Sequence, residues 1–190
     1  MTDTVSQRMV EATYREATAQ DVEGIAVLHA DSWRRHYRGA YSDSFLDNEV
    51  VPDRNRVWME RLNRPDRSNE CTIVAERDRT IVGFAHTILN ADEQWGALLD
   101  NLHVRYDLKG SGIGTRLMVE TAKAVLERSP SSGLFLWVLE GNTAAQAFYA
   151  ARIGKRAGSK TSEAPGGSTI AAFRYVWPDP SVLLAQASSA

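Results

Sequence analysis

The stretch Lys109-Gly110-Ser111-Gly112-Ile113-Gly114 lies between a predicted strand and a predicted helix. The apolar run before it, Trp95 to Val104, predicts the strand, and the helical spacing after it continues to about Arg128. A helix that begins directly after glycines presents backbone N–H groups to an anion, and the helix dipole adds attraction. The stretch therefore predicts a phosphate-binding turn.

Two common phosphate-binding loops fit this turn poorly. A nucleoside-triphosphate loop needs a lysine after its last glycine, but Thr115 follows Gly114 here. A dinucleotide loop needs Gly-x-Gly-x-x-Gly and an acidic residue about 20 residues later. Thr115 stands at the place of the third glycine, and Glu127 comes too early and lies on the helix. The spacing therefore favours a third kind of loop.

The remaining periodicity and turn residues predict the order β, α, α, β, β, β, α, β, α, β, β. This order indicates a mixed α/β (α+β) fold with a mostly antiparallel central sheet and flanking helices. The elements expected on either side of the turn are strands 13–17, 72–76, 80–89, 95–104, 134–139, 156–160 and 169–177, and helices 18–38, 52–63 and 142–152.

Composition limits the class of protein. The chain has 190 residues, a formal net charge of −2 and one cysteine, Cys71, which we expect to be a buried small residue. We expect a disordered segment 1–12, one domain over 13–178 and a loose tail over 179–190. No global basic field argues for nucleic acid, no apolar run has the length of a membrane span, and no Cys or His spacing indicates a metal. A cytoplasmic protein with no metal, nucleic-acid or membrane partner is expected.

Two segments together resemble the GNAT N-acetyltransferase superfamily. Lys109-x-x-Gly112-x-Gly114 is similar to its acetyl-coenzyme A loop, Gln/Arg-x-x-Gly-x-Gly/Ala, with lysine in the first place. The stretch from Asn142 to Tyr149 matches the pattern Asn-x-x-Ala-x-x-Phe-Tyr at all four positions, whereas the usual Gly-Phe that follows reads Gly154-Lys155. The resemblance covers roughly Thr13 to Trp177 and implies the GNAT acyltransferase fold.

The resemblance implies an acetyl-CoA-dependent N-acetyltransferase, in which a primary amine attacks the thioester directly. A non-catalytic acyl-CoA-binding sensor or regulatory module is the alternative, and a nucleotide hydrolase is a more distant one. Asn142 can serve as the N-cap of its helix as well as contact the cosubstrate. The implied acetyl-CoA-binding residues are Leu102, His103, Val104, Lys109, Gly110, Ser111, Gly112, Ile113, Gly114, Thr115, Asn142 and Tyr149.

Tyr149 is the proton donor that the resemblance implies. A phenol with a pKa of about 10 can protonate a departing thiolate whose thiol has a pKa of about 8.5; packing beside Phe148 is the other interpretation of this tyrosine. For the base we expect Asp100 or Glu93, with His86 and His103 as alternatives and a water relay as another route. Strand alternation places His103 on the face opposite Asp100, which we expect to share a face with Leu102 and Val104.

A small-molecule or peptide amine is the expected acceptor, bound between the N-terminal helices and the loop near 163–167. An aromatic wall suits a cationic or apolar amine, although the same residues could simply pack the two helices together. An exposed edge strand could pair with a second copy, so a homodimer is one expected assembly. The expected substrate-binding residues are Trp33, His36, Tyr37 and Tyr41, with Phe45 beside them.

Overall fold

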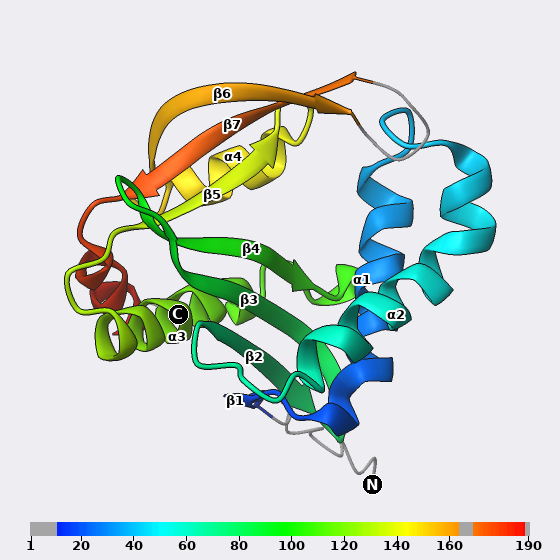
Figure 1. Cartoon of the computed structure of the whole chain (residues 1–190), viewed down its shortest axis with the longest axis horizontal. Coiled ribbons are helices and arrows are strands. Elements are labelled where there is room, and N and C mark those ends of the chain that lie inside the picture. The colour runs from blue at the N-terminus through cyan, green and yellow to red at the C-terminus, as the bar shows by residue number, and fades with distance from the viewer. Residues whose placement is uncertain (1–10, 164–168, 189–190) are drawn as a thin grey trace, which may run out of the picture.

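The structure is a computed structural model that describes residues 11–163 and 169–188. Within these residues, seven strands form one mixed sheet in the order β1-β2-β3-β4-β5-β7-β6 (Figure 1). All neighbouring pairs among them are antiparallel except β4 and β5, and the expected fold class is confirmed. The strands are β1 (Thr13–Glu16), β2 (Glu70–Arg77), β3 (Thr80–Asp92), β4 (Gly96–Val104), β5 (Leu134–Leu139), β6 (Lys155–Glu163) and β7 (Thr169–Trp177).

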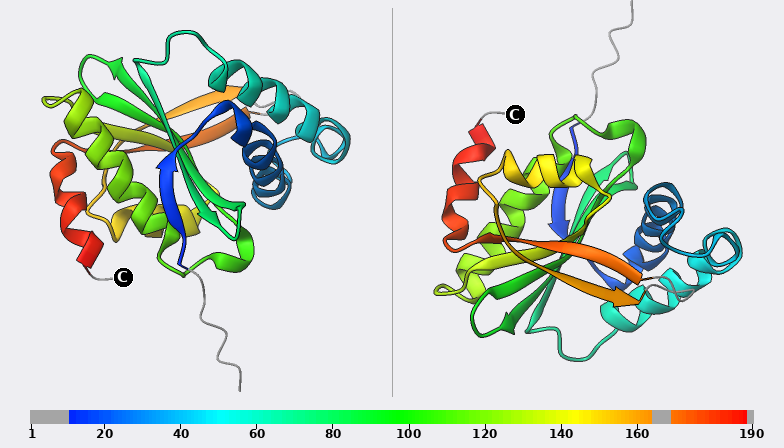
Figure 2. Two further views of the ribbon diagram at one scale, coloured as in Figure 1. Left: turned by 90° about the horizontal axis from the view of Figure 1, so that it is seen from below. Right: turned by 90° about the horizontal axis from the view of Figure 1, so that it is seen from above.

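Helices cover both faces of this sheet, as the two further views show (Figure 2). One face carries α1 and α2, and the other carries α3, with η4 packed beside it. Short helical turns connect these elements. The helices are η1 (Ala19–Asp21), α1 (Val22–His36), the π-helical η2 (Phe45–Glu49), α2 (Val50–Leu62), η3 (Tyr106–Leu108), α3 (Ile113–Arg128), α4 (Thr143–Ala150) and η4 (Pro180–Ser188).

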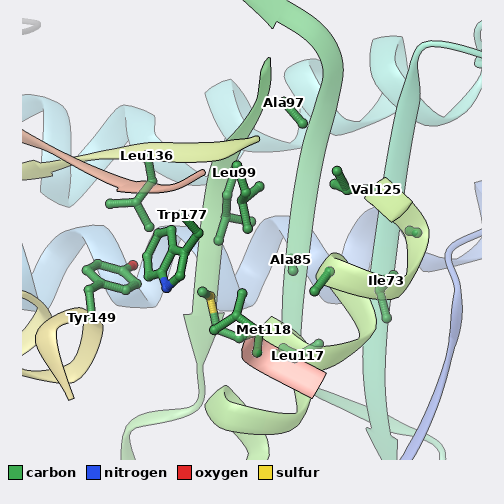
Figure 3. Packing of buried hydrophobic residues seen from close by; sticks show 14 of the residues in the cluster. Ile73, Ala85, Ala97, Leu99, Leu117, Met118, Val125, Leu136, Tyr149 and Trp177 are labelled. Carbon is green, nitrogen blue, oxygen red and sulfur yellow. The ribbon is translucent and has the colours of Figure 1, made fainter. Parts of the chain in front are cut away.

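The larger core lies between the sheet and α3 (Figure 3). Leu117 and Met118 of α3 are fully buried against the strand residues Ala85 and Leu99. Burial of one such side chain stabilises a fold by about 1.5–3 kcal/mol. The apolar residues that recur at helical spacing after the glycine turn therefore form the face of α3 that packs on the sheet. This packing fixes the position of the N-terminus of α3.

The parallel strands β4 and β5 diverge soon after they meet. Their register contains only the pairs Ala97 with Leu134 and Leu98 with Phe135. The later halves of both strands are not paired with each other, so their facing backbone groups lack the hydrogen bonds of a sheet. This divergence separates the C-terminal halves of β4 and β5. The gap therefore lies at the end of β4 that leads into the glycine turn.

A β-bulge in β4 changes which way its side chains face. His86 of β3 pairs with Asn101, and the next residue, Thr87, pairs with Leu99, so Asp100 is the extra residue. A bulge shifts the alternation of the strand by one position. Leu102 and Val104 consequently pack toward the core against α3. The expectation that Asp100 shares their face is thereby corrected.

The C-terminal segment is ordered where we expected a loose tail over 179–190. Residues Pro180–Ser188 form η4, which packs on α3, and the Leu183 side chain is only 1% exposed. This burial of apolar surface explains why the small residues of the tail do not remain loose. In the other expected terminal segment, 1–12, residues 1–10 lie outside the described part of the chain.

The turn after α4 contains a strained residue. Ile153 has a φ of +63° and is 55% exposed. A left-handed conformation costs an L-residue roughly 1–2 kcal/mol, whereas glycine adopts it freely. Next to it, Gly154 lies so close to Trp177 and to the Tyr149 carbonyl that a Cβ would clash with both.

We expect Ile153→Gly to stabilise the protein by about 1 kcal/mol, because the relief of strain exceeds the entropy that glycine gains in the unfolded chain. For a chain of this length the melting temperature should rise by about 2–4 °C. Ile153→Ala is the matched control: it removes the same exposed side chain but keeps the Cβ. A gain of the same size in both variants would contradict strain as the cause.

Candidate active site

A cavity of about 850 Å³ occupies the space where β4 and β5 diverge. Its volume falls in the range of small-molecule sites. The second half of β4 forms one wall, the second half of β5 and helix α4 form the opposite wall, and the glycine turn closes one end. Residues from the C-terminal end of α1 and from β6 and β7 complete the lining.

The glycine turn presents backbone N–H groups to one end of this cavity. Gly110 has a φ of +83°, and Gly112, the N-cap of α3, has a φ of +85°. The first helical hydrogen bond of α3 runs from the Arg116 N–H to the Gly112 carbonyl, at 3.0 Å. In the described residues the preceding N–H groups, at positions 113–115, have no acceptor. This arrangement has the donors with which a helix N-terminus can bind an anion.

Two cations flank the same end of the cavity. The Arg152 guanidinium hydrogen-bonds the Thr115 hydroxyl, donates to the Phe148 carbonyl at 2.8 Å and lies 3.5 Å from the centroid of the Phe148 ring. The Lys109 ammonium lies 2.7 Å from Nε2 of His36. Neither cation pairs with a carboxylate within residues 11–163 and 169–188. Their charge is therefore available to an anion at the helix terminus.

Burial lowers the pKa of both cations from its ordinary value. For Lys109 the charge of Arg35 lowers the pKa further. For Arg152 burial is the largest effect. Partly desolvated cations without counter-charges are the groups that a bound phosphate stabilises most.

We expect Arg152→Gln to weaken coenzyme A binding about 10- to 100-fold, the loss typical of charge-assisted hydrogen bonds. Isothermal titration of coenzyme A measures the dissociation constant. Arg116→Gln is the matched control, because Arg116 lies on the first turns of α3 but pairs with Glu120 at 2.7 Å, outside the cavity lining. Equal affinity in the two variants would remove Arg152 from the anion site.

The middle of the cavity is an open strand edge. Leu102, His103 and Val104 of β4 line it from one side, and residues 137–139 of β5 line it from the other. Asn142 also lines the cavity, where its side chain accepts a hydrogen bond from the Ala145 N–H at 3.1 Å and so caps α4. An extended ligand could pair with the unpaired β4 edge as an added strand.

Tyr149 of α4 is a buried residue of the cavity lining. Its side chain is 9% exposed and its ring packs against Tyr175 and Trp177, with centroids 6.0 and 6.1 Å away (Figure 3 shows Tyr149 beside Trp177). Burial raises the pKa of its phenol well above the ordinary value. In the described residues its hydroxyl has no hydrogen-bond partner, although the residue lines the cavity. The phenol is therefore a protonated donor that faces the cavity without an acceptor.

Of the two histidines considered as bases, His103 lines the cavity and His86 does not in the described residues. Nδ1 of His103 lies 2.8 Å from the Ser32 hydroxyl, and burial lowers the pKa of His103 to about 3, so this imidazole is neutral at pH 7. His86 is 1% exposed, and its Nδ1 lies 2.8 Å from the Thr72 hydroxyl. His86 does not line the cavity in the described residues, so the structure separates it from the reacting end.

The two expected carboxylates lie in different places. Asp100 lines the cavity and pairs with Arg61 at 2.8 Å. Glu93 lies in the turn between β3 and β4, at the opposite end of β4 from the glycine turn, and does not line the cavity in the described residues. The bulge brings Asp100 and His103 to the same cavity, which corrects the expectation that they face opposite sides.

The expected aromatic wall is only partly in the cavity. His36, Tyr37 and Tyr41 line it, whereas Trp33 is absent from the described lining. The Trp33 ring packs 4.1 Å from the Arg54 guanidinium and 5.1 Å from the Tyr41 ring. Trp33 therefore supports the wall from behind. Likewise the Ile113 side chain is 2% exposed in the core, so only its backbone N–H can serve a ligand.

Several lining residues lie outside the set that sequence reasoning selected. Arg152 could have been found, because it lies four positions after Phe148 and so shares its helix face. Ser32, Trp137 and Lys160 carry no local signal, since they reach the cavity only through the packing of α1, β5 and β6.

Two further findings concern metals and membranes. Residues 11–163 and 169–188 contain no group of three or more His, Cys, Asp and Glu side chains that could hold a metal ion. None of the described helices combines the length and the apolar character that crossing a membrane requires.

Comparison with known proteins gives matches over most of the chain. A family model described as Acetyltransferase (GNAT) family matches residues 24–154. An uncharacterized N-acetyltransferase of Bacillus subtilis is 28% identical over 174 residues, covering 90% of this chain and 95% of the relative. A probable N-acetyltransferase of Mycobacterium tuberculosis is 27% identical over 140 residues, covering 71% of this chain and 75% of the relative.

Solved structures show the same fold. The crystal structure of a PaiA N-acetyltransferase from Thermoplasma acidophilum, in complex with coenzyme A, superposes with a TM-score of 0.66 at 19% sequence identity. The match covers 87% of this chain and 99% of that one.

Proposed function

The chain belongs to the acetyltransferase (GNAT) family and is an acetyl-CoA-dependent N-acetyltransferase, and we propose that its reaction takes place in the cavity between β4 and β5. The observation that carries the proposal is the line of groups along this cavity. An anion site at the start of α3 leads along an unpaired strand edge to a buried phenol that has no partner among the described residues. The cavity thus offers, in order, what the phosphates, the pantetheine arm and the thioester of acetyl-CoA require.

At the phosphate end, the free N–H groups of positions 113–115 and the Arg152 and Lys109 cations hold the pyrophosphate. Along the middle, the backbone of Leu102 to Val104 pairs with the pantetheine arm. A backbone N–H near Val104 then polarises the thioester carbonyl, so that the developing negative charge on its oxygen is stabilised.

At the reacting end, the amine nitrogen forms a bond to the carbonyl carbon and the carbon–sulfur bond breaks. Tyr149 gives its phenolic proton to the departing sulfur, which leaves as the thiol. The amine loses one proton, and Asp100 is the lining carboxylate that can take it through water. Glu93, in the turn before β4, is not among the described residues that line the cavity.

Incubation with acetyl-CoA and a panel of primary amines tests the function. Release of thiol together with an acetylated amine, identified by mass spectrometry, is the expected result, and a reaction without amine measures background hydrolysis. Binding of coenzyme A without an acetylated product from any amine would instead support the sensor alternative.

A homodimer and a cytoplasmic location stay predictions. The strand β6 offers an edge for pairing, because it is the last strand of the sheet and most of its residues are exposed. Size-exclusion chromatography with light scattering measures the oligomeric state.

A further inference from the structure

A second, smaller cavity of about 260 Å³ borders the first one. The residues Asp100, Trp137 and Lys160 line both cavities, so the two cavities adjoin at these side chains. Its other walls come from the end of β3, from Leu98 and Phe135 of the paired parts of β4 and β5, and from Arg174 of β7. An amine that reaches the thioester from this side passes Asp100 and Trp137.

The carboxylates of the small cavity already have partners. Asp100 pairs with Arg61 at 2.8 Å. Asp92 accepts hydrogen bonds from the backbone N–H groups of Gln94 and Trp95, both at 2.9 Å. Asp92 and one oxygen of Asp100 are thus engaged within the protein, whereas Oδ1 of Asp100 accepts no hydrogen bond in the described residues and stays available to the amine.

The cations of the small cavity have no such partners. Neither Arg174 nor Lys160 forms an ion pair in the described part of the chain. The Arg174 guanidinium lies between two indole rings, 4.6 Å from the Trp95 centroid and 4.5 Å from that of Trp137, and its Nε is buried without a hydrogen-bond partner. The Lys160 ammonium lies 4.3 Å from the Trp137 centroid.

Ring contacts hold these two cations in place but leave their donors unused. A guanidinium that stacks on an aromatic face keeps its N–H groups in its own plane, where only an acceptor at the edge can satisfy them. Burial lowers the pKa of Lys160 and the positive charge of Arg174 lowers it further, while the charge of Asp100 only partly opposes these two effects. A negative group placed between Arg174 and Lys160 would accept hydrogen bonds from their unused N–H groups and would reduce the repulsion between the two positive charges.

We infer that the acceptor is a small amine that also carries a carboxylate, with the carboxylate bound by Arg174 and Lys160 and the amine directed past Asp100 to the thioester. This inference rests on the proposed function, since the large cavity must hold the thioester. The volume of about 260 Å³ suits a molecule of amino-acid size.

Pairs of amines that differ only in charge test the inference. L-glutamate is compared with its diamide, and 4-aminobutyrate and 5-aminopentanoate are compared with their primary amides. Spermidine serves as a purely cationic amine. At least one acid should have a kcat/KM that is about 10- to 100-fold above that of its amide, as expected for charge-assisted hydrogen bonds to a carboxylate. Thiol release from acetyl-CoA gives the rates.

Substitutions then locate the effect. Arg174→Gln and Lys160→Gln should each lower kcat/KM for the preferred acid about tenfold or more, mainly through KM, and leave the amide within about twofold. Arg174→Lys should restore part of the preference. Arg156→Gln is the matched control, since it removes a cation that stacks on Phe173 at 3.2 Å but lines neither cavity. Lys160 is an exposed residue, so its variant tests the inference even if Arg174→Gln lowers the melting temperature.

Two results would overturn the inference in distinguishable ways. Amides or spermidine that react as well as the acids would overturn it and leave the acetyltransferase function intact. Coenzyme A binding without turnover of any amine would overturn the proposed function and the inference together.

Discussion

Gly112→Val should weaken coenzyme A binding by about 100-fold or more. Gly112 is the N-cap of α3 and has a φ of +85°. A β-branched residue there costs roughly 1–2 kcal/mol of backbone strain. Relief of that strain rotates the neighbouring N–H groups away from the anion site, and each hydrogen bond lost to a charged group costs about 1.5–3 kcal/mol. Loss of two such hydrogen bonds costs about 3 kcal/mol or more, and since each 1.4 kcal/mol is about tenfold in affinity, this loss corresponds to about a hundredfold or more.

Gly39→Val separates loss of the anion site from general strain. Gly39 has a φ of +81°, and a Cβ built on it meets no atom within 4 Å. Both variants should therefore lose a few degrees of thermal stability. Only Gly112→Val should lose affinity in a coenzyme A titration. Equal affinities in the two variants would show that the glycine turn does not bind the phosphates.

Tyr149→Phe should lower kcat about 100-fold and leave the dissociation constant of coenzyme A within about twofold. General acid catalysis contributes about 10²- to 10⁴-fold, and removal of the hydroxyl leaves the sulfur without its proton donor. The ring contacts with Tyr175 and Trp177 remain in the variant. Steady-state kinetics together with a coenzyme A titration separate the two constants.

Two tyrosines serve as controls for Tyr149. Tyr175→Phe removes a hydroxyl from a buried neighbour outside the described cavity lining, so it should keep the wild-type rate. Tyr37 lines the cavity, and burial raises the pKa of its phenol to about 12. A larger rate loss in Tyr37→Phe than in Tyr149→Phe would assign the proton donor to Tyr37.

The pH dependence follows from the direction of the Tyr149 shift. Burial raises the pKa of this phenol above its ordinary value, so the proton stays on the oxygen as the pH rises from 7 to about 9. The rate should therefore not fall in this interval through loss of the acid. A fall in kcat near pH 8 that disappears in Tyr149→Phe would contradict this assignment of the pKa.

Local features of the sequence were sufficient for the order of elements. The helix after the glycine turn ends at Arg128 as expected, and the expected hairpin of β2 and β3 is confirmed. Asn142 caps α4, as its residue type indicates. Such signals depend on backbone hydrogen bonds and side-chain periodicity within a few residues, and they also carried the family resemblance.

Side-chain positions in the site depended on contacts between distant segments. The bulge at Asp100 reverses the alternation of β4 because β3 pairs with Asn101 and Leu99, and no residue of β4 alone signals this register. Trp33 was expected in the cavity wall, yet the packing of Arg54 against its ring places it behind Tyr41. A strand pattern says that two faces exist, but the register between strands decides which face a residue occupies.

The sequence by itself determined the family and the cosubstrate, and it predicted the turn that we propose for the phosphates, because these follow from the spacing of neighbouring residues. Only the tertiary structure decided which charges meet in the cavity. Arg152 joins Lys109 beside the glycine turn, and Arg174 joins Lys160 in the smaller cavity, each pair from separate elements. Electrostatic interactions act through space over a few ångströms, so their partners are set by the packing of the fold and not by proximity along the chain.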